Sequence, residues 1–265
     1  MPEGHTVRRQ AREHAARFRG ERVHVTSPQG RFAEGAALLD GRVLDGTDAY
    51  GKHLWLVFAG DRLLHVHLGL YGGWTFGPLP APVPRGALRV RLEAEGSYAD
   101  LRGPTVCEVH TPGDRDAVLA RLGPDPLRPR HDPWRAFARV SRSRSSVGLL
   151  LMDQAVAAGV GNVYRAEVLF RAGIDPHRPG RLVTRDEWGA LWSDLVALMR
   201  AGVRAGRIVT TRPQDRDRVS GRARREDAHY VYRRTGLPCR VCGTPVAHEV
   251  MGARNLFWCP RCQPG

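Results

Sequence analysis

Lysine is almost missing from this chain of 265 residues, although the chain is strongly basic. Of its 41 basic residues only Lys52 is a lysine, and the other 40 are arginine. Asparagine is nearly as scarce, occurring only at Asn162 and Asn255. Because arginine supplies nearly all of the positive charge, the single lysine indicates a position that needs a compact, titratable ammonium in place of a planar guanidinium.

Long apolar runs are also missing. No stretch approaches the roughly 20 apolar residues of a membrane-spanning helix, and residues 54–59 are typical of a buried strand. The N-terminal region has no apolar core of a signal peptide. We therefore expect a soluble, cytoplasmic protein without a membrane partner.

Acidic residues are too few to balance the arginines. The chain has 27 of them, which leaves a net charge of +14 and a pI near 10.8. An excess of this size repels itself and is typically compensated by a polyanion, so the composition favours a nucleic-acid partner.

Residues 1 to about 125 carry one helical pattern, over Val7–Phe18, followed by short apolar or alternating runs separated by Gly, Pro and Asp. This spacing predicts a β-sandwich or barrel. The strand candidates are Arg22–Thr26, Gly41–Gly46, His53–Phe58, Leu63–Leu68, Leu88–Leu92 and Val106–Val109.

A proline-rich stretch over residues 123–130 predicts a hinge, and helical periodicity follows it. Helices are expected over Leu149–Ala158, Val163–Ala172 and Arg185–Ala201, the last opened by a capping box of Thr184 and Glu187. The polar residues 210–227 are expected to form a mobile loop. The sequence thus divides into an N-terminal domain (1–123), a linker (124–135), a helical domain (136–228) and a cysteine-rich segment (229–265).

Four of the five cysteines form two CxxC pairs, separated by sixteen residues. They are Cys239, Cys242, Cys259 and Cys262. This spacing is typical of a zinc site, and four thiolates would complete the tetrahedral shell, so we expect one structural Zn²⁺ per chain. Disulfides are the alternative, which a long, cytosolic-looking chain disfavours. Cys107 is expected to be a buried core thiol.

The chain begins Met1-Pro2-Glu3-Gly4. Removal of Met1 would leave the secondary amine of Pro2 at the N-terminus. An α-amino group titrates near pH ~8, so part of it is unprotonated at neutral pH and can form a Schiff base with an aldehyde-like carbon. Glu3 could exchange the proton that this step requires. Taken alone, Pro2 could equally be an ordinary second residue.

The turn Gly159-Val160-Gly161 joins two apolar helical patterns and precedes Asn162. Such a turn brings backbone amides to a helix N-terminus, where phosphate binds readily. Asn162 is expected to cap the second helix and to donate to a phosphate. A plain helical hairpin is the alternative.

Five motifs together, in this order, resemble the formamidopyrimidine-DNA glycosylase / endonuclease VIII family of base-excision repair enzymes. They span essentially the whole chain. They are Pro2-Glu3-Gly4, Gly51-Lys52, the segment 67–72 (His-Leu-Gly-Leu-Tyr-Gly), the segment 151–164 ending Asn-Val-Tyr, and the CxxC segment 232–263.

The resemblance implies an α+β fold: an N-terminal β-sandwich with a helix, a helical helix–two-turn–helix domain and a zinc finger with four cysteine ligands. It also implies a monomeric glycosylase and lyase that binds damaged DNA. Pro2 would be the nucleophile, Glu3 the general acid and base, and Lys52 a proton-transfer group, while Arg254 would support a second elimination. Contacts to DNA would come from His67, Leu70, Tyr71, Arg121 and Asn162.

Some residues depart from the pattern of that family. Position 6 is Thr6, where family members often have an acidic residue, and Arg102 lacks the aromatic residue that follows the arginine in the 8-oxoguanine branch. Leu70 and Tyr71 look more like the endonuclease VIII branch and suit an apolar wedge, although residues beside a turn can equally be core. We therefore expect oxidised pyrimidines and abasic sites as substrates.

Two other functions remain open from the sequence. The chain could be a non-catalytic DNA-binding module of the same fold, with Arg254 a solvated hairpin residue. It could also be a zinc-containing protein that binds RNA or ribosomes.

Overall fold

The computed structural model describes residues 2–217, 219 and 221–265. Met1 therefore lies outside the described residues. The chain folds into two compact units, residues 1–121 and residues 122–265, and each is described here by itself.

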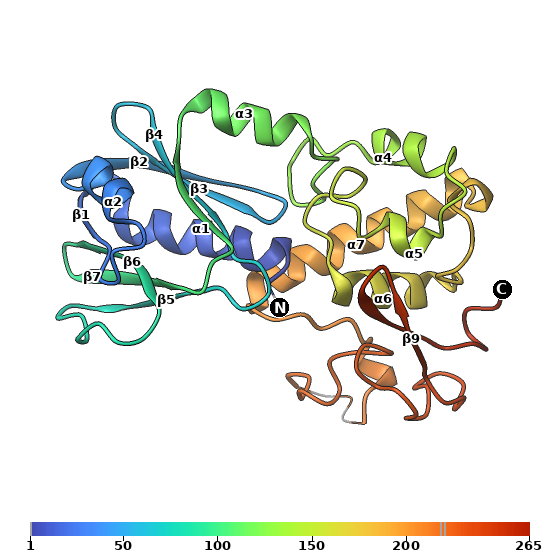
Figure 1. Cartoon of the computed structure of the whole chain (residues 1–265). Coiled ribbons are helices and arrows are strands. Elements are labelled where there is room, and N and C mark those ends of the chain that lie inside the picture. The colour runs from blue at the N-terminus through green and yellow to red at the C-terminus, as the bar shows by residue number, and fades with distance from the viewer. Residues whose placement is uncertain (1, 218, 220) are drawn as a thin grey trace. The chain divides into compact units, whose positions relative to one another are not determined.

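The first unit contains a long helix, α1 (Gly4–Phe18), two shorter helices and an antiparallel sheet (Figure 1). The shorter helices are α2 (Ala33–Leu39) and α3 (Pro112–Ala120). The strands are β1 (Arg22–Thr26), β2 (Arg42–Tyr50), β3 (His53–Phe58), β4 (Arg62–His67), β5 (Gly73–Pro78), β6 (Leu88–Ala94), β7 (Ser97–Arg102) and β8 (Val106–His110).

The strand order β5-β7-β6-β1-β2-β3-β4-β8 divides into two halves at β1. The first two residues of β1 pair with β2, and its last three residues pair with β6. Apolar side chains from both halves and from α1 form one core, which includes Phe18, Val90 and Leu56. Two antiparallel layers around a shared core are the architecture that the sequence predicts for this region.

The sequence did not predict strands β5 and β7. In β5 two glycines and a proline interrupt the apolar pattern, and in β7 charged residues interrupt it. In β7, Asp100 is 1% exposed and lies opposite Arg91 of β6. The guanidinium of Arg91 donates to both carboxylate oxygens of Asp100, at 2.7 and 2.9 Å. A bidentate pair satisfies the buried charge, so a strand that looks too polar can lie inside the sandwich.

Helix α1 begins three residues earlier than predicted. The backbone carbonyl of Glu3 accepts hydrogen bonds from the amides of Thr6 and Val7, which starts the helix at Gly4. Strand β2 is longer than predicted, because its polar second half continues to pair with β3 as far as Tyr50. Within that half, Thr47 donates its hydroxyl to the carbonyl of Ala11 at 2.9 Å.

The second unit is helical around a core centred on α7 (Arg185–Ala205), whose tryptophans Trp188 and Trp192 are almost fully buried. The predicted capping box of Thr184 and Glu187 is present, and Gly206 ends the helix in a left-handed conformation. The other helices are α4 (Pro133–Val140), α5 (Val147–Leu150), α6 (Asn162–Ala172) and the 3₁₀ turns Gly180–Leu182 and Pro213–Asp215.

The helix predicted over Leu149–Ala158 is wrong beyond its first two residues, since α5 (Val147–Leu150) ends at Leu150. Backbone groups that a helix would use internally bond elsewhere. The carbonyl of Gln154 accepts from the amide of Gly123, and the amide of Ala158 donates to the carbonyl of Pro124. The predicted helix α6 is confirmed to within one residue.

The last segment contains a hairpin of β9 (Ala247–Met251) and β10 (Arg254–Trp258), beside α6 in Figure 1. A third apolar cluster, including Phe170, Tyr230 and Phe257, joins α6 to this segment. Residues 210–227 contain no helix or strand apart from a 3₁₀ turn, among those that the structure describes. None of the described helices is both long and apolar enough to span a bilayer.

Candidate active site and nucleic-acid interface

The start of α1 and the β2–β3 turn lie at the same end of the first unit. The hydroxyl of Thr47 bonds the carbonyl of Ala11, and two residues further along β2 the carbonyl of Ala49 accepts from Arg8 at 3.4 Å. The N-terminal end of α1 therefore lies toward the end of β2 that leads into the turn with Lys52. The predicted nucleophile and the only lysine thus belong to one region.

Glu3 is fully buried and immediately precedes α1, whereas Pro2 is partly exposed. A helix N-terminus carries partial positive charge, which favours an ionised carboxylate at this position. Next to it, burial lowers the pKa of His5 to about 4, so this imidazole is neutral at pH 7. A buried carboxylate beside a partly exposed residue 2 is an arrangement suited to proton transfer at that residue.

Lys52 lies among histidines. His53 follows it in the chain and pairs across the sheet with His67. Burial, reinforced by the charges of neighbouring groups that include Arg121 and Lys52, lowers the pKa of His53 to about 4. Burial and Lys52 also lower the pKa of His67. Lys52 adjoins His53 in the chain, and His53 lies opposite His67 of β4; Arg121 is exposed at the end of α3.

A hydrogen bond to the backbone fixes the tautomer of His67. Its Nδ1 accepts a hydrogen bond of 3.2 Å from the amide of Gly69, so in the neutral ring the proton lies on Nε2. A neutral imidazole in this tautomer can donate to a phosphate oxygen without carrying charge.

Leu70 and Tyr71 project from a tight loop and are not core residues. Leu70 is 39% exposed and Tyr71 is 92% exposed. Glycines hold the loop: Gly69 has φ +64°, and a Cβ on Gly72 would lie 2.3 Å from the carbonyl oxygen of Leu68. A large, solvated aromatic on a constrained loop suits contact with a partner more than stability of the fold.

Asn162 does not cap α6 as predicted. The cap is Gly161, and Asn162 is the first helical residue, 4% exposed. Its amide donates to the backbone carbonyl of Asn255 at 2.8 Å, and its side-chain oxygen accepts from Arg165. Arg165 also donates to the Asn255 carbonyl at 3.1 Å. Asn162 therefore ties the glycine-rich turn to the hairpin that carries Arg254.

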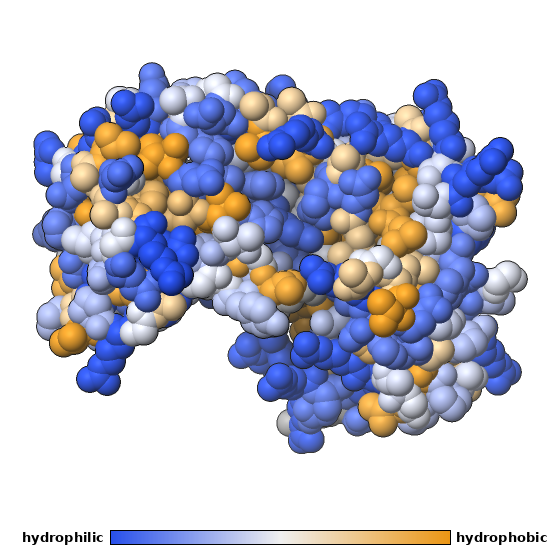
Figure 2. Space-filling view, in the orientation of Figure 1, coloured by the Kyte–Doolittle hydropathy of each residue, from blue (hydrophilic) through white to orange (hydrophobic). Residues whose placement is uncertain are grey.

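Arg254 begins β10 and is exposed. Its guanidinium makes only a 3.4 Å contact with the adjacent Ala253 carbonyl among the contacts recorded for the described residues. The cation is consequently available to an anionic partner at the point where Asn162 fixes the hairpin. Hydrophilic residues predominate on the face of the molecule seen in Figure 2.

The four predicted zinc ligands converge. Their sulfur atoms all lie within 4.8 Å of one another. The Sγ–Sγ distances are 3.8 Å for Cys239–Cys262 and 3.4 Å for Cys242–Cys259. Four sulfurs at about 2.3 Å from a tetrahedral Zn²⁺ are separated by about 3.8 Å, so the cluster fits one structural zinc ion. Cys107 is half-buried in β8 against the first core, and burial raises the pKa of its thiol to about 12.

A buried carboxylate that the sequence did not reveal connects α6 to the zinc-binding segment. Glu167 is fully buried and accepts hydrogen bonds from the backbone amides of Tyr230, Val231 and Tyr232, at 2.8 to 2.9 Å. The hydroxyl of Thr210 donates to the same carboxylate. The only sequence signal is a glutamate on the apolar face of a helix, which by itself indicates no partner.

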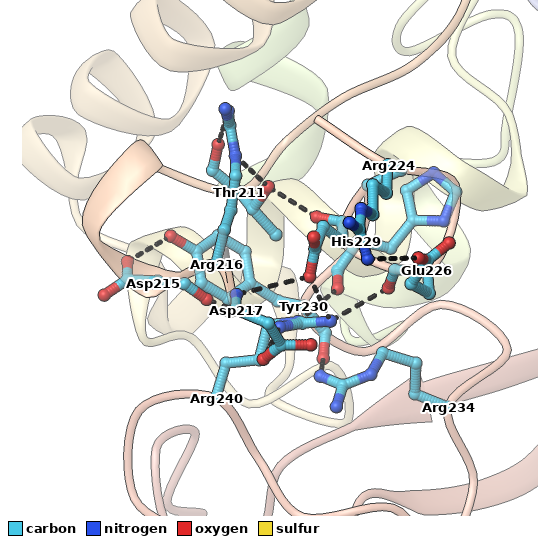
Figure 3. A network of polar contacts seen from close by, with 12 residues as sticks. Thr211, Asp215, Arg216, Asp217, Arg224, Glu226, His229, Tyr230, Arg234 and Arg240 are labelled. Atoms are coloured by element: carbon cyan, nitrogen blue, oxygen red, sulfur yellow. Dashed lines mark hydrogen bonds and ion pairs between the residues drawn. The ribbon is translucent and has the colours of Figure 1, made fainter. Parts of the chain in front are cut away.

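The segment before the finger is held by a polar network (Figure 3). Arg240, 7% exposed at its side chain, lies 3.1 Å from a carboxylate oxygen of the buried Asp227 and donates to the carbonyl of Glu226. Tyr230 donates its hydroxyl to Asp215 at 2.5 Å. The residues predicted as a mobile loop thus have fixed partners at both ends, while Val219 between them is exposed.

Three family models match the chain in succession. The formamidopyrimidine-DNA glycosylase N-terminal domain matches residues 1–107, the formamidopyrimidine-DNA glycosylase H2TH domain matches residues 122–214, and a zinc finger found in FPG and IleRS matches residues 236–265.

Curated relatives align over the whole chain. "Endonuclease 8 1" of Mycobacterium tuberculosis is 50% identical, and the alignment covers 99% of this chain and 100% of that protein. Formamidopyrimidine-DNA glycosylase of Symbiobacterium thermophilum is 36% identical, over 100% of this chain and 88% of that protein.

Solved structures share the fold. The crystal structure of MutM (Fpg) from Thermus thermophilus has a TM-score of 0.80 at 31% identity, covering 99% of this chain and 98% of that one. A complex of the Lactococcus lactis Fpg with DNA containing an abasic site has a TM-score of 0.84 at 20% identity, covering 99% and 100%.

Proposed function

This chain belongs to the formamidopyrimidine-DNA glycosylase / endonuclease VIII family of bifunctional DNA glycosylase/AP lyases in base-excision repair, and we propose that it removes oxidised pyrimidines. On this proposal it also nicks abasic sites, through a Schiff base at Pro2. The observation that carries the proposal is the placement of Pro2 and the buried Glu3 at the end of the first unit that also holds Lys52.

The chemistry begins at the sugar. The nitrogen of Pro2 attacks C1′ of the damaged nucleotide, the bond from C1′ to the base breaks, and the base leaves with a proton. Glu3 donates the proton that opens the sugar ring and so yields the iminium ion. This step requires a free amine at Pro2 and therefore removal of Met1.

Strand cleavage follows from the iminium ion. A proton leaves C2′ and the C3′–O bond breaks, which is the first elimination; Lys52 exchanges protons in this step. A second elimination removes a proton from C4′ and breaks the C5′–O bond, and Arg254 stabilises the phosphate that departs. The exposed guanidinium of Arg254, on a hairpin fixed by Asn162, supports this assignment.

The proposed preference for oxidised pyrimidines rests on the loop that carries Leu70 and Tyr71 and on the name of a relative. Leu70 and Tyr71 project from their loop and would fill the gap in the helix when the damaged base leaves the stack. The 50% identical relative is named an endonuclease 8. Arg102 lacks the aromatic residue that follows the arginine in the 8-oxoguanine branch.

The remaining assignments concern DNA contact and organisation. We propose that His67, Arg121 and Asn162 contact phosphates, and that the chain acts as a monomer associated with the nucleoid through DNA. We retain residues 1–123 as the catalytic domain, 124–135 as a hinge, 136–228 as the helix–two-turn–helix domain and 229–265 as the zinc finger.

Borohydride trapping tests the proposal. The zinc-loaded protein, with its mature N-terminus verified by mass spectrometry, is incubated with abasic duplex DNA and borohydride. Reduction makes a Schiff base permanent, so we expect a covalent adduct that maps to Pro2, and none with Pro2→Gly. An adduct at Lys52, or no adduct from protein that starts at Pro2, would overturn the assignment.

The second candidate, a non-catalytic DNA-binding module, uses the same arginines and zinc finger. It predicts tight binding to abasic duplex DNA without nicking, and equal binding by Pro2→Gly. Competition with structured RNA separates both candidates from an RNA-binding protein, since preference for RNA would exclude a repair enzyme.

A further inference from the structure

Two histidines and a glutamate meet on the outer strands of the first unit and have no part in the proposed reaction. His65 of β4 lies directly opposite Glu108 of β8. His110 lies two residues beyond Glu108 on the same strand. Side chains opposite each other in a sheet, and side chains two residues apart on one strand, share a face.

The three side chains are close enough to share one ion. One potential ligand atom from each of His65, Glu108 and His110 lies within 4.8 Å of the other two. The His110 Nε2 to Glu108 Oε2 distance is 3.4 Å. Two ligands at about 2.0–2.1 Å from a tetrahedral Zn²⁺ are separated by about 3.4 Å, so this pair already spans one edge of such a shell.

His65 is oriented as metal-binding histidines are. Its Nε2 lies 2.9 Å from Nδ1 of His53. With the proton on Nε2 donated to His53, the lone pair on Nδ1 of His65 is free to bind an ion. This Nδ1 is buried and has no hydrogen-bond partner among the residues that the structure describes.

His110 also has a ring nitrogen without a hydrogen-bond partner. It is 9% exposed, and its Nδ1 also lacks a partner within the described part of the chain. Its ring lies 4.3 Å from that of His65, centroid to centroid. Buried polar atoms are normally satisfied, so the unpartnered Nδ1 of His65 points to a missing ligand. His110 faces Glu108 with Nε2, and this is the nitrogen that would bind the ion.

Glu108 contributes a carboxylate ligand and lies where an ion can reach the cluster from solvent. Its side chain is 63% exposed, whereas His65 and His110 are buried. An ion can therefore enter from solvent beside the carboxylate and bind the imidazoles behind it. Two imidazoles and one carboxylate form a ligand set for borderline divalent ions such as Zn²⁺.

We propose that His65, Glu108 and His110 form a second metal site, which binds a divalent transition-metal ion of the zinc class. It is distinct from the four-cysteine site, and it leaves one coordination position for water. It does not depend on the proposed glycosylase chemistry.

The test counts metal ions. Tag-free protein with its cysteine site filled is dialysed against buffered micromolar Zn²⁺, and bound zinc is measured per chain. We expect two equivalents for the wild type and one for Glu108→Gln and His110→Gln. His24→Gln is the matched control, because His24 and Asp40 form an exposed pair at 2.7 Å without a third ligand.

The absorption spectrum of bound Co²⁺ identifies the type of ligand. Co²⁺ bound by imidazole and carboxylate shows ligand-field bands without the thiolate charge-transfer band of a cysteine site, and Glu108→Gln should remove them. Added Zn²⁺ should raise the melting temperature of the wild type but not of Glu108→Gln, because a ligand that binds only the folded state stabilises it.

One equivalent of zinc in the wild type would overturn the proposal. So would a second equivalent that persists in both Glu108→Gln and His110→Gln, since that ion would be bound elsewhere. Glu108 is exposed, so its substitution leaves the fold intact and keeps the test decisive even if His110→Gln fails to fold.

Discussion

The side-chain amide of Asn162 donates a 2.8 Å hydrogen bond to the backbone carbonyl of Asn255. These are the only two asparagines of the chain, and they are 93 positions apart. The bond joins the start of α6 to the hairpin of the zinc finger, one residue from Arg254. Asn162, which is predicted to contact phosphate, thus also positions Arg254, the arginine predicted to stabilise the departing phosphate.

Replacing Asn162 by Ala should weaken this connection. We expect the free energy of unfolding to fall by about 1–3 kcal/mol, as measured by urea denaturation, because the change removes the bond to Asn255 and also the oxygen that accepts from the buried Arg165. Asn255→Ala is the matched control, because the acceptor is a backbone carbonyl and survives the substitution. Equal destabilisation by both changes would refute the role assigned to Asn162.

Glu3→Gln should abolish proton transfer while retaining shape. We expect the single-turnover rate of abasic-site nicking to fall by about 10²–10⁴-fold, the typical contribution of general acid–base catalysis, with little change in DNA affinity. Glu13→Gln, on the partly exposed side of the same helix, provides the comparison. A rate within a factor of two of wild type would remove Glu3 from the mechanism.

Tyr71→Ala should separate base removal from strand cleavage. Because Tyr71 is 92% exposed, its loss should leave the melting temperature unchanged. Excision of an oxidised pyrimidine from duplex DNA should slow by about tenfold, since the gap left by the flipped base is no longer filled. Nicking of a preformed abasic site should change much less. Val83→Ala, at 75% exposure, is the control, and an equal loss of both activities would contradict a wedge.

Arg254→Ala should remove one phosphate contact. The slope of log Kobs against log salt concentration for abasic duplex DNA should decrease in magnitude by about 1. Fluorescence anisotropy at several salt concentrations measures this slope. The exposed Arg31, replaced by Ala, should leave it unchanged. An unaltered slope for Arg254→Ala would mean that this guanidinium does not contact phosphate.

The β9–β10 hairpin should become less stable as pH rises. His177 lies 2.7 Å from Asp175 and 2.8 Å from Glu249 of β9. Burial lowers the pKa of His177, but hydrogen bonds to the two carboxylates outweigh it, and the net pKa is raised above 6.5. A raised pKa in the folded state gives stability that is complete below pH 6.5 and is lost as pH rises through the folded value.

Hydrogen exchange at β9 measures this effect. Protection of β9 amides, corrected for intrinsic exchange, should decrease between pH 6 and pH 9, and His177→Gln should flatten the dependence. A wild-type profile already flat over that range would show that the His177 contacts do not anchor the hairpin.

The sequence by itself determined the features that depend on local spacing. Two CxxC pairs specify a zinc site because a thiolate pair on a tight turn needs no other part of the chain to be recognised. The capping box of Thr184 and Glu187 marks the start of α7 for the same reason.

Tertiary structure decided the features whose partners are distant in sequence. The predicted helix over Leu149–Ala158 failed because Gly123 and Pro124 take over its backbone hydrogen bonds. Asp100 could be recognised as part of a buried strand only through Arg91. Likewise, the cluster of His65, Glu108 and His110 exists only because β4 pairs with β8, a strand far away in the chain. Period and spacing act within a few residues, whereas burial and pairing depend on which segments the fold brings together.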